Sequence, residues 1–228
     1  MFNKQNMSSS LIHQMQWMIL LVAFSAAFTA CKEPEIPTVV VAKNDETYAP
    51  EKVRAVLDLW QKRTFDFFYV GASPTGLALE GTDRGDVVTT GGTGFGLMAL
   101  VVGAERSYVT RTQAAEQTVR IVRFLGKAER FKGVWSHWYN PDGTAHPFGD
   151  QVKTGDVVET GFLMAGLLSS AEYFAQNNAV EKEIRDSVAS FFNTINWRFY
   201  ASSGEYLHWL WYSQENRFAL PIRGWNEV

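Results

Sequence analysis

The sequence predicts an all-α domain in which buried helices are surrounded by amphipathic ones. Helix-length segments with apolar residues three and four positions apart dominate the chain after Pro50. Segments that are apolar on nearly every face alternate with segments that are apolar on one face only. Loops rich in glycine, aspartate and aromatic residues connect them at 71–92, 133–155 and 200–225. Because long loops usually carry function, we expect a site to be built from these three.

Five helices are predicted, and each has a distinct pattern of apolar residues. They are expected at 51–69, 93–106, 110–126, 156–174 and 179–195. Segments 93–106 and 156–174 are apolar on most faces, so we assign them to the inner layer. The other three have a single apolar stripe, which is typical of an outer layer. Thr110 or Thr112 is suited to cap the helix that follows it.

The composition excludes several classes of protein. The chain has 228 residues, of which 46% are hydrophobic and 20% are charged, and its net charge is −3. These values argue against a collagen-like, disordered or polytopic membrane protein. The mildly acidic balance provides no basic face for nucleic acid, so no nucleic-acid partner is expected.

Residues 1–30 have the pattern of an export signal. Lys4 provides the positive start, and 17–30 is an apolar run too short to span a bilayer, followed directly by Cys31. This pattern predicts a lipoprotein signal peptide, an acylated Cys31 and a polar tether over 31–50, with the domain at 51–228. The protein would be exported and anchored in the bacterial outer membrane, facing the periplasm or the cell surface. The alternative is an ordinary signal peptide with a coincidental cysteine.

Asp156 and Glu159 are the first candidates for chemistry. They open a very apolar predicted helix, and residues three positions apart share a helix face with Cβ atoms about 5–6 Å apart. The apolar residues that follow leave the two carboxyl groups few polar neighbours, which favours a raised pKa in one of them. The alternative is structural, with Asp156 as the N-cap and Glu159 as its capping-box partner.

A further acid, Glu227, lies beside Trp225 and Asn226 near the end of the sequence. Trp225 offers a flat apolar face for a sugar ring next to a possible acid or base. In the 133–155 loop, Trp135, His137 and Trp138 are candidates for sugar contacts as well. For all of these aromatic residues, packing in the core is the alternative.

Asp83 and Arg84 lie in a glycine-rich loop. No Lys-Ser/Thr pair follows them, so we predict hydrogen bonds to a polar ligand at a cleft rim and not a phosphate loop. The histidines lack the spacing of a zinc site, no Gly-x-Ser-x-Gly sequence is present, and the only cysteine is assigned to the lipid. No metal and no cofactor are predicted. Acid/base chemistry by carboxylates remains, as in most glycoside hydrolases.

Segment 89–106, TTGGTGFGLMALVVGAER, resembles a characteristic stretch of the bacterial glucoamylase-like domain family. Further matches occur in the same order along the chain. They are found at 122–125, 133–139, 156–160 and 224–227, and the resemblance covers about 52–228.

This resemblance implies an (α/α)6 toroid, built of helical hairpins in two layers, and an exported endo-β-1,2-glucanase activity. It implies acid/base roles for Glu159 and Glu227, support or water activation by Asp156, and a cleft lined by Asp83 and Arg84. Cleavage would be inverting: one carboxyl protonates the leaving oxygen while a second, about 6.5–9.5 Å away, activates water. The expected partner is a glucan oligosaccharide or polysaccharide, with the membrane contacted only through the lipid.

The family domain is longer than this chain, which resembles only about its N-terminal half. We therefore expect a toroid truncated to roughly its first half, with apolar inner-helix surface exposed, poor solubility and weak or absent activity. Two other functions remain open on the sequence alone. A non-catalytic glycan-binding lipoprotein would use the aromatic residues without paired carboxylates, and an α-glucan hydrolase would act on starch-type chains.

Overall fold

The computed structural model describes residues 50–150, 153–201, 204 and 206–222. The predicted signal peptide, all of the tether before Pro50, Cys31, Trp225 and Glu227 lie outside these residues. What the sequence indicates about them stays a prediction.

Helices form most of the regular structure, in the order α2 (Pro50–Tyr69), α3 (Thr90–Glu105), α4 (Arg111–Lys127), α5 (Val157–Tyr173), α6 (Ala179–Thr194) and the short α7 (Trp197–Tyr200). The five predicted helices are confirmed. The start of α3 was predicted too late, because its first turn contains Gly91 and Gly92, which are poor helix formers. Thr110 caps α4 and forms a capping box with Gln113.

Short strands accompany the helices, so the prediction of an all-α domain is wrong in this respect. β1 (Val88–Thr89) pairs with β4 (Trp138–Tyr139), and β2 (Arg130–Phe131) with β3 (Val134–Trp135). A third antiparallel sheet has the order β5 (Thr154–Asp156), β6 (Leu207–Tyr212) and β7 (Arg217–Ile222). The hairpin of β6 and β7 lies in the segment predicted as the loop 200–225. Its aromatic residues favour strands, and each strand is too short for a helical pattern to be tested.

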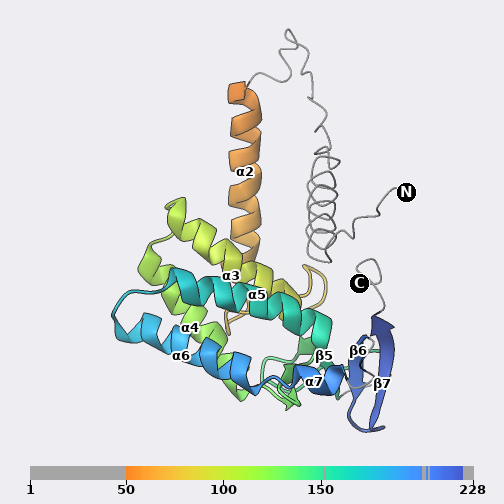
Figure 1. Ribbon diagram of the computed structural model, residues 1–228. Coiled ribbons are helices and arrows are strands. Elements are labelled where there is room, and N and C mark those ends of the chain that lie inside the picture. Colours follow the sequence, from red (N-terminus) through yellow and green to blue (C-terminus); the bar gives the residue numbers. More distant parts are fainter. Residues whose placement is uncertain (1–49, 151–152, 202–203, 205, 223–228) are drawn as a thin grey trace, which may run out of the picture. The chain divides into compact units, whose positions relative to one another are not determined.

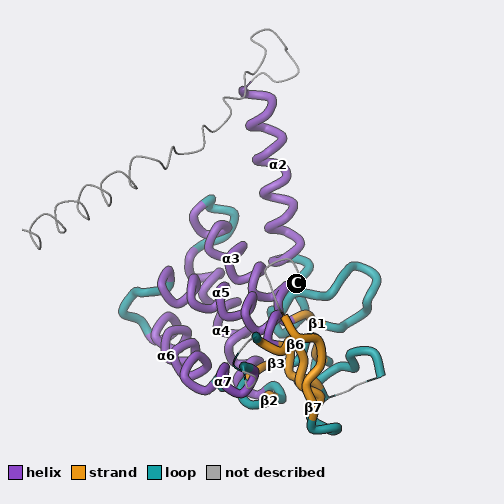
Figure 2. The backbone as a smooth tube through the Cα atoms, turned by 45° about the vertical axis from the view of Figure 1, so that its right-hand side comes forward, coloured by secondary structure: helices purple, strands orange, loops and turns teal. Residues whose placement is uncertain are grey.

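α3 and α5 lie side by side, with α4 and α6 packed against them (Figures 1 and 2). Their backbones approach so closely that glycine is required at the contact. A Cβ on Gly94 would overlap the Phe162 carbonyl, and one on Gly166 would overlap the Gly94 carbonyl. The glycines that weaken α3 as an isolated helix therefore allow it to pair with α5.

Helices α4 and α6 are joined by an ion pair between residues of their first turns. The Arg111 guanidinium donates to both Glu181 carboxylate oxygens, each at 2.9 Å, and to the Tyr173 carbonyl at 2.6 Å. These hydrogen bonds and the positive charge of Arg111 hold the pKa of Glu181 below its ordinary value, although burial opposes the shift. The pair links α4 to α6 and to the end of α5.

The assignment of α3 and α5 to a buried layer is correct for one side of the pair only. Leu97, Leu100, Leu163 and Leu167 are almost completely buried. On the other side, Phe95 is 48% and Phe162 is 41% exposed, and their rings contact each other with centroids 5.5 Å apart. The expected exposure of apolar surface on these helices is therefore present in the structure.

The close approach of α3 and α5 predicts opposite effects for two glycines of α5. Gly166→Ala should lower the free energy of unfolding by about 1–3 kcal/mol, because the added methyl group meets backbone that cannot rotate away. Gly161→Ala should raise it by about 0.5–1 kcal/mol, because a Cβ there meets no atom within 4 Å and alanine is the better helix former. Urea unfolding followed by circular dichroism measures both, and equal effects would contradict the glycine contact.

Candidate active site

The candidate site lies where the first turns of α3 and α5 meet. Each helix directly follows a strand, since β1 leads into α3 and β5 leads into α5. The segment between β3 and β4 is held against α3, because the Thr90 amide donates to the His137 carbonyl at 3.0 Å and the Thr90 hydroxyl donates to the Ser136 carbonyl. Three segments distant in sequence thus contribute side chains to one place.

Asp156 is completely buried and is the N-cap of α5. Its Oδ1 accepts hydrogen bonds from the Val158 and Glu159 amides at 3.0 Å each and from Trp209 Nε1 at 2.9 Å. Its Oδ2 lies 2.7 Å from His137 Nδ1. A carboxylate has about four acceptor positions, so protein groups satisfy this one fully. The structural interpretation of Asp156 as an N-cap is confirmed.

Glu159 does not complete a capping box. Its side chain instead reaches across to α3, where Oε2 accepts a hydrogen bond from the Gly91 amide at 2.7 Å. Glycine at residue 91 allows this contact, because a Cβ there would overlap Oε2 and displace the carboxylate. Burial raises the pKa of this carboxyl, and the nearby negative charges of Asp156 and Glu80 act in the same direction. Against these, the positive charge of His137 and the Gly91 hydrogen bond lower it.

His137 lies between the two acids and is mostly buried, with 16% of its side chain exposed. Burial by itself lowers the pKa of the imidazole, but the hydrogen bond and charge of Asp156 outweigh it. The charges of Glu159 and Glu80 add to the shift, and the net pKa of His137 is raised. A protonated His137 beside Asp156 therefore balances part of the negative charge of the site.

The two tryptophan candidates of the 133–155 loop differ in their exposure to solvent. Trp138 is partly exposed, its ring stacks on Phe148 with centroids 5.5 Å apart, and its buried Nε1 has no hydrogen-bond partner within the described ranges. The prediction that Trp135 binds substrate is wrong. Its side chain is fully buried, and its Nε1 donates to the Leu125 carbonyl at 3.1 Å, so no face is available to a ligand.

Asp83 and Arg84 are exposed on the segment between α2 and β1. Neither forms a hydrogen bond or ion pair with Asp156, His137 or Glu159 in the described part of the chain. Their predicted role at a cleft rim stays a prediction, as do the roles of Trp225 and Glu227.

Three residues of the site were missed by sequence reasoning: Glu80, Gly91 and Trp209. Glu80 is a single acid in a loop and has no motif around it. Trp209 is one of several aromatic residues in the predicted loop 200–225, and its hydrogen bond to Asp156 depends on the β5–β6 pairing. Gly91 belongs to a glycine-rich segment whose packing role becomes visible only with α5 in place.

Among residues 50–150, 153–201, 204 and 206–222, no cluster of three or more histidine, cysteine or acidic side chains could hold a metal ion. In the same residues, no helix combines the length and the apolar character needed to cross a membrane.

Comparison with family profiles gives no match. A relative with a known description is the exo-β-1,2-glucooligosaccharide sophorohydrolase (non-reducing end) of Parabacteroides distasonis. It is 38% identical over 192 residues, which cover 80% of this chain and 26% of that protein. The chain is homologous to it. The resemblance predicted from the sequence is thereby confirmed.

Two solved structures of β-1,2-glucanases are also similar to this chain. The endo-β-1,2-glucanase of Chitinophaga pinensis, in complex with sophorotriose and glucose, is 36% identical with a TM-score of 0.70, over 76% of this chain and 44% of that one. A β-1,2-glucanase of Parabacteroides distasonis is 37% identical with a TM-score of 0.70, over 76% of this chain and 26% of that one. The chain spans less than half the length of each of these relatives.

The Gly91–Glu159 contact predicts a specific effect of a small substitution. Gly91→Ala should displace the Glu159 carboxylate, remove a hydrogen bond that lowers the Glu159 pKa, and so raise that pKa further. NMR titration of side-chain-labelled glutamate measures the change. Gly126→Ala on α4 is the matched control, because a Cβ there makes only ordinary contacts with Phe191. An unchanged Glu159 pKa in Gly91→Ala would contradict the geometry.

The His137–Asp156 pair predicts a pH dependence of stability. The folded-state pKa of His137 is raised, so its stabilising contribution is complete below the unfolded value of about 6.5 and is lost as the pH rises through the folded value. Asp156→Asn should lower the His137 pKa, as read from the imidazole proton shifts. Asp142→Asn, on an exposed turn, should leave it unchanged. A wild-type His137 titrating at or below the ordinary value would count against the pair.

Proposed function

We propose that the protein is a glycoside hydrolase that acts on β-glucan, specifically on β-1,2-linked chains. The homologues support the substrate class, since they are a sophorohydrolase and two β-1,2-glucanases. The proposal rests on the burial, the pKa and the position of Glu159. This carboxyl is partly buried, has a raised pKa and is held in place at the junction of two helix starts.

Glu159 is proposed as the general acid. A raised pKa favours the protonated form of the carboxyl, and a glycosidase needs that proton for the leaving oxygen. Oε2 is engaged with the Gly91 amide, whereas Oε1 accepts no hydrogen bond from any described residue. Oε1 is therefore the oxygen available to a substrate. Glu227 stays our proposal for the second carboxylate, which activates water in an inverting reaction.

Asp156 is proposed as a positioning residue. Its buried carboxylate fixes the first turn of α5, the imidazole of His137 and the indole of Trp209 at once, and has no acceptor position left for water or sugar. It acts on the reaction through Glu159, whose backbone amide it holds. Trp138, whose side chain is partly exposed, is proposed to contact a sugar ring.

For the architecture, we propose an (α/α)6 toroid, of which α3 and α5 are inner helices and α4 and α6 outer ones. The exposed Phe95 and Phe162 would then face the interior of the ring. We also propose export and anchoring through an acylated Cys31, supported by the signal pattern of residues 1–30. Incorporation of labelled palmitate that is lost in Cys31→Ser tests the anchor.

The hydrolase proposal predicts that the protein releases oligosaccharides from β-1,2-glucan and none from starch. The chain is incubated at high concentration with linear β-1,2-glucan and, separately, with starch, and the oligosaccharides are separated by chromatography. Glu159→Gln should reduce product formation from β-1,2-glucan by about 100-fold or more, as expected on loss of a general acid. Wild-type kcat/KM should fall as the pH rises through the raised Glu159 pKa, because only the protonated acid is active.

Glu116→Gln is the matched control, since this glutamate is exposed on α4 and should change the rate by less than twofold. Products from starch alone would contradict the linkage. Binding of β-1,2-glucan without hydrolysis, unaffected by Glu159→Gln, would favour the glycan-binding lipoprotein instead.

A further inference from the structure

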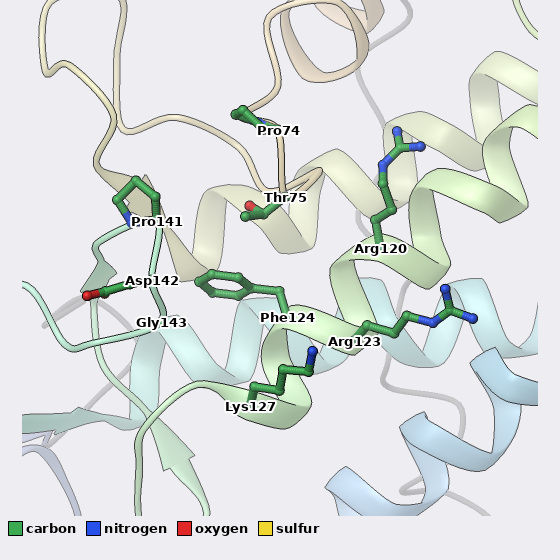
Figure 3. A pocket seen from close by; sticks show the side chains of 9 residues that line it. All are labelled: Pro74, Thr75, Arg120, Arg123, Phe124, Lys127, Pro141, Asp142 and Gly143. Atoms are coloured by element: carbon green, nitrogen blue, oxygen red, sulfur yellow. The ribbon is translucent and has the colours of Figure 1, made fainter.

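A pocket lies apart from the candidate active site, because neither Glu159 nor His137 is among its lining residues. It has a volume of about 360 Å³ and is formed by α4, the segment before β1 and the turn before β5 (Figure 3). Its lining residues are Pro74, Thr75, Arg120, Arg123, Phe124, Lys127, Pro141, Asp142 and Gly143. None of them belongs to the candidate active site. A pocket of this size matches a single small ligand.

One side of the pocket is cationic because of helical spacing. Arg120, Arg123 and Lys127 are three and four positions apart and therefore share one face of α4. Arg123 is neutralised, since it donates to both carboxylate oxygens of Glu183 at 2.6 and 2.8 Å. Arg120 makes its side-chain hydrogen bond to the neutral Gln117, at 3.0 Å. Lys127 has no ion pair within the described ranges.

The opposite side of the pocket carries Asp142, the only acidic residue of the lining. The Asp142 carboxylate accepts hydrogen bonds from the amide and hydroxyl of Thr144, which lowers its pKa. Arg120 and Lys127 have no carboxylate partner among the described residues, so the lining stays net positive although the ionised Asp142 offsets one charge. They are seven positions apart on α4, about 10 Å along the helix axis, which leaves room for a monosaccharide between them.

The middle of the pocket is apolar. Figure 3 shows the Phe124 ring between the proline side and the basic side chains of α4. The ring is partly exposed, and its edge-to-face contact with Tyr139, with centroids 6.1 Å apart, holds it in place. An aromatic ring flanked by Pro74 and Pro141 offers flat contacts to the C–H face of a pyranose, and Thr75 adds a hydroxyl for hydrogen bonding.

We propose that this pocket binds a hexose that carries an anionic group, a phosphate or a carboxylate. The sugar ring lies on Phe124, and the anion is bound by Arg120 or Lys127, one at each end of the ring, through charge-assisted hydrogen bonds. The site is separate from hydrolysis at Glu159 and does not depend on it. Such a site would allow the protein to respond to, or hold, a charged sugar while the candidate active site acts on a neutral chain.

Isothermal titration of the full chain tests the proposal with four probes: glucose 6-phosphate, glucuronate, glucose and inorganic phosphate. At least one of the two anionic sugars should bind at least tenfold more tightly than both glucose and inorganic phosphate. The comparison between glucose 6-phosphate and glucuronate identifies which anion is preferred. Equal affinity for inorganic phosphate would show a simple anion contact and overturn the proposal, as would equal affinity for glucose.

Variants locate the site. Arg120→Gln combined with Lys127→Gln should weaken binding of the anionic sugar at least tenfold. Lys52→Gln combined with Arg54→Gln, on exposed positions of α2, removes the same charge and should change it less than twofold. Glu159→Gln should leave it unchanged, which separates this site from the proposed function. Loss of binding in Glu159→Gln, or equal loss in both double variants, would overturn the proposal.

Discussion

The structure depends on the close approach of α3 and α5 through glycine. Gly94 and Gly166 bring the two backbones into contact, and Gly91 brings the start of α3 within hydrogen-bond distance of Glu159. A larger residue at Gly94 or Gly166 would separate the helices, and one at Gly91 would displace the Glu159 carboxylate. Core packing and the geometry of the candidate site therefore rest on one constraint: the helix pair that buries Leu97 and Leu163 also sets the environment of the Glu159 carboxyl.

Electrostatics in the site follow from that geometry. The buried Asp156 is tolerated because amide, indole and imidazole groups satisfy it, and its charge raises the pKa of His137. Glu159 receives only one hydrogen bond from the protein and is partly buried, so its protonated form is favoured. Two carboxyl groups three residues apart thus have different environments, since Asp156 accepts several hydrogen bonds from the protein and Glu159 accepts one. This difference is the basis for proposing different roles for them.

Helical periodicity predicted the five main helices, and the spacing of Asp156 and Glu159 predicted that their side chains belong to one site, whose chemistry stays a prediction. The β6–β7 hairpin was missed, because short aromatic strands leave no period to detect. Trp135 was misassigned because an indole looks the same in a sequence whether it packs in a core or faces a sugar. Glu80 affects the pKa of Glu159, and Trp209 donates a hydrogen bond to Asp156. Both residues are distant in sequence from their partners, so no local sequence pattern predicts these interactions.

The glycine content of α3 also affects the order of folding. The helix has five glycines in 16 residues, and each lowers intrinsic helix stability by about 1 kcal/mol relative to alanine. Such a segment is not expected to persist as a helix alone, so α3 depends on its neighbours, above all on α5, which begins more than 50 residues further along the chain. Closing so long a loop adds an entropic cost to the pairing of α3 with α5. Because Glu159 acquires its Gly91 partner in that same pairing, the candidate site forms when the two helices meet.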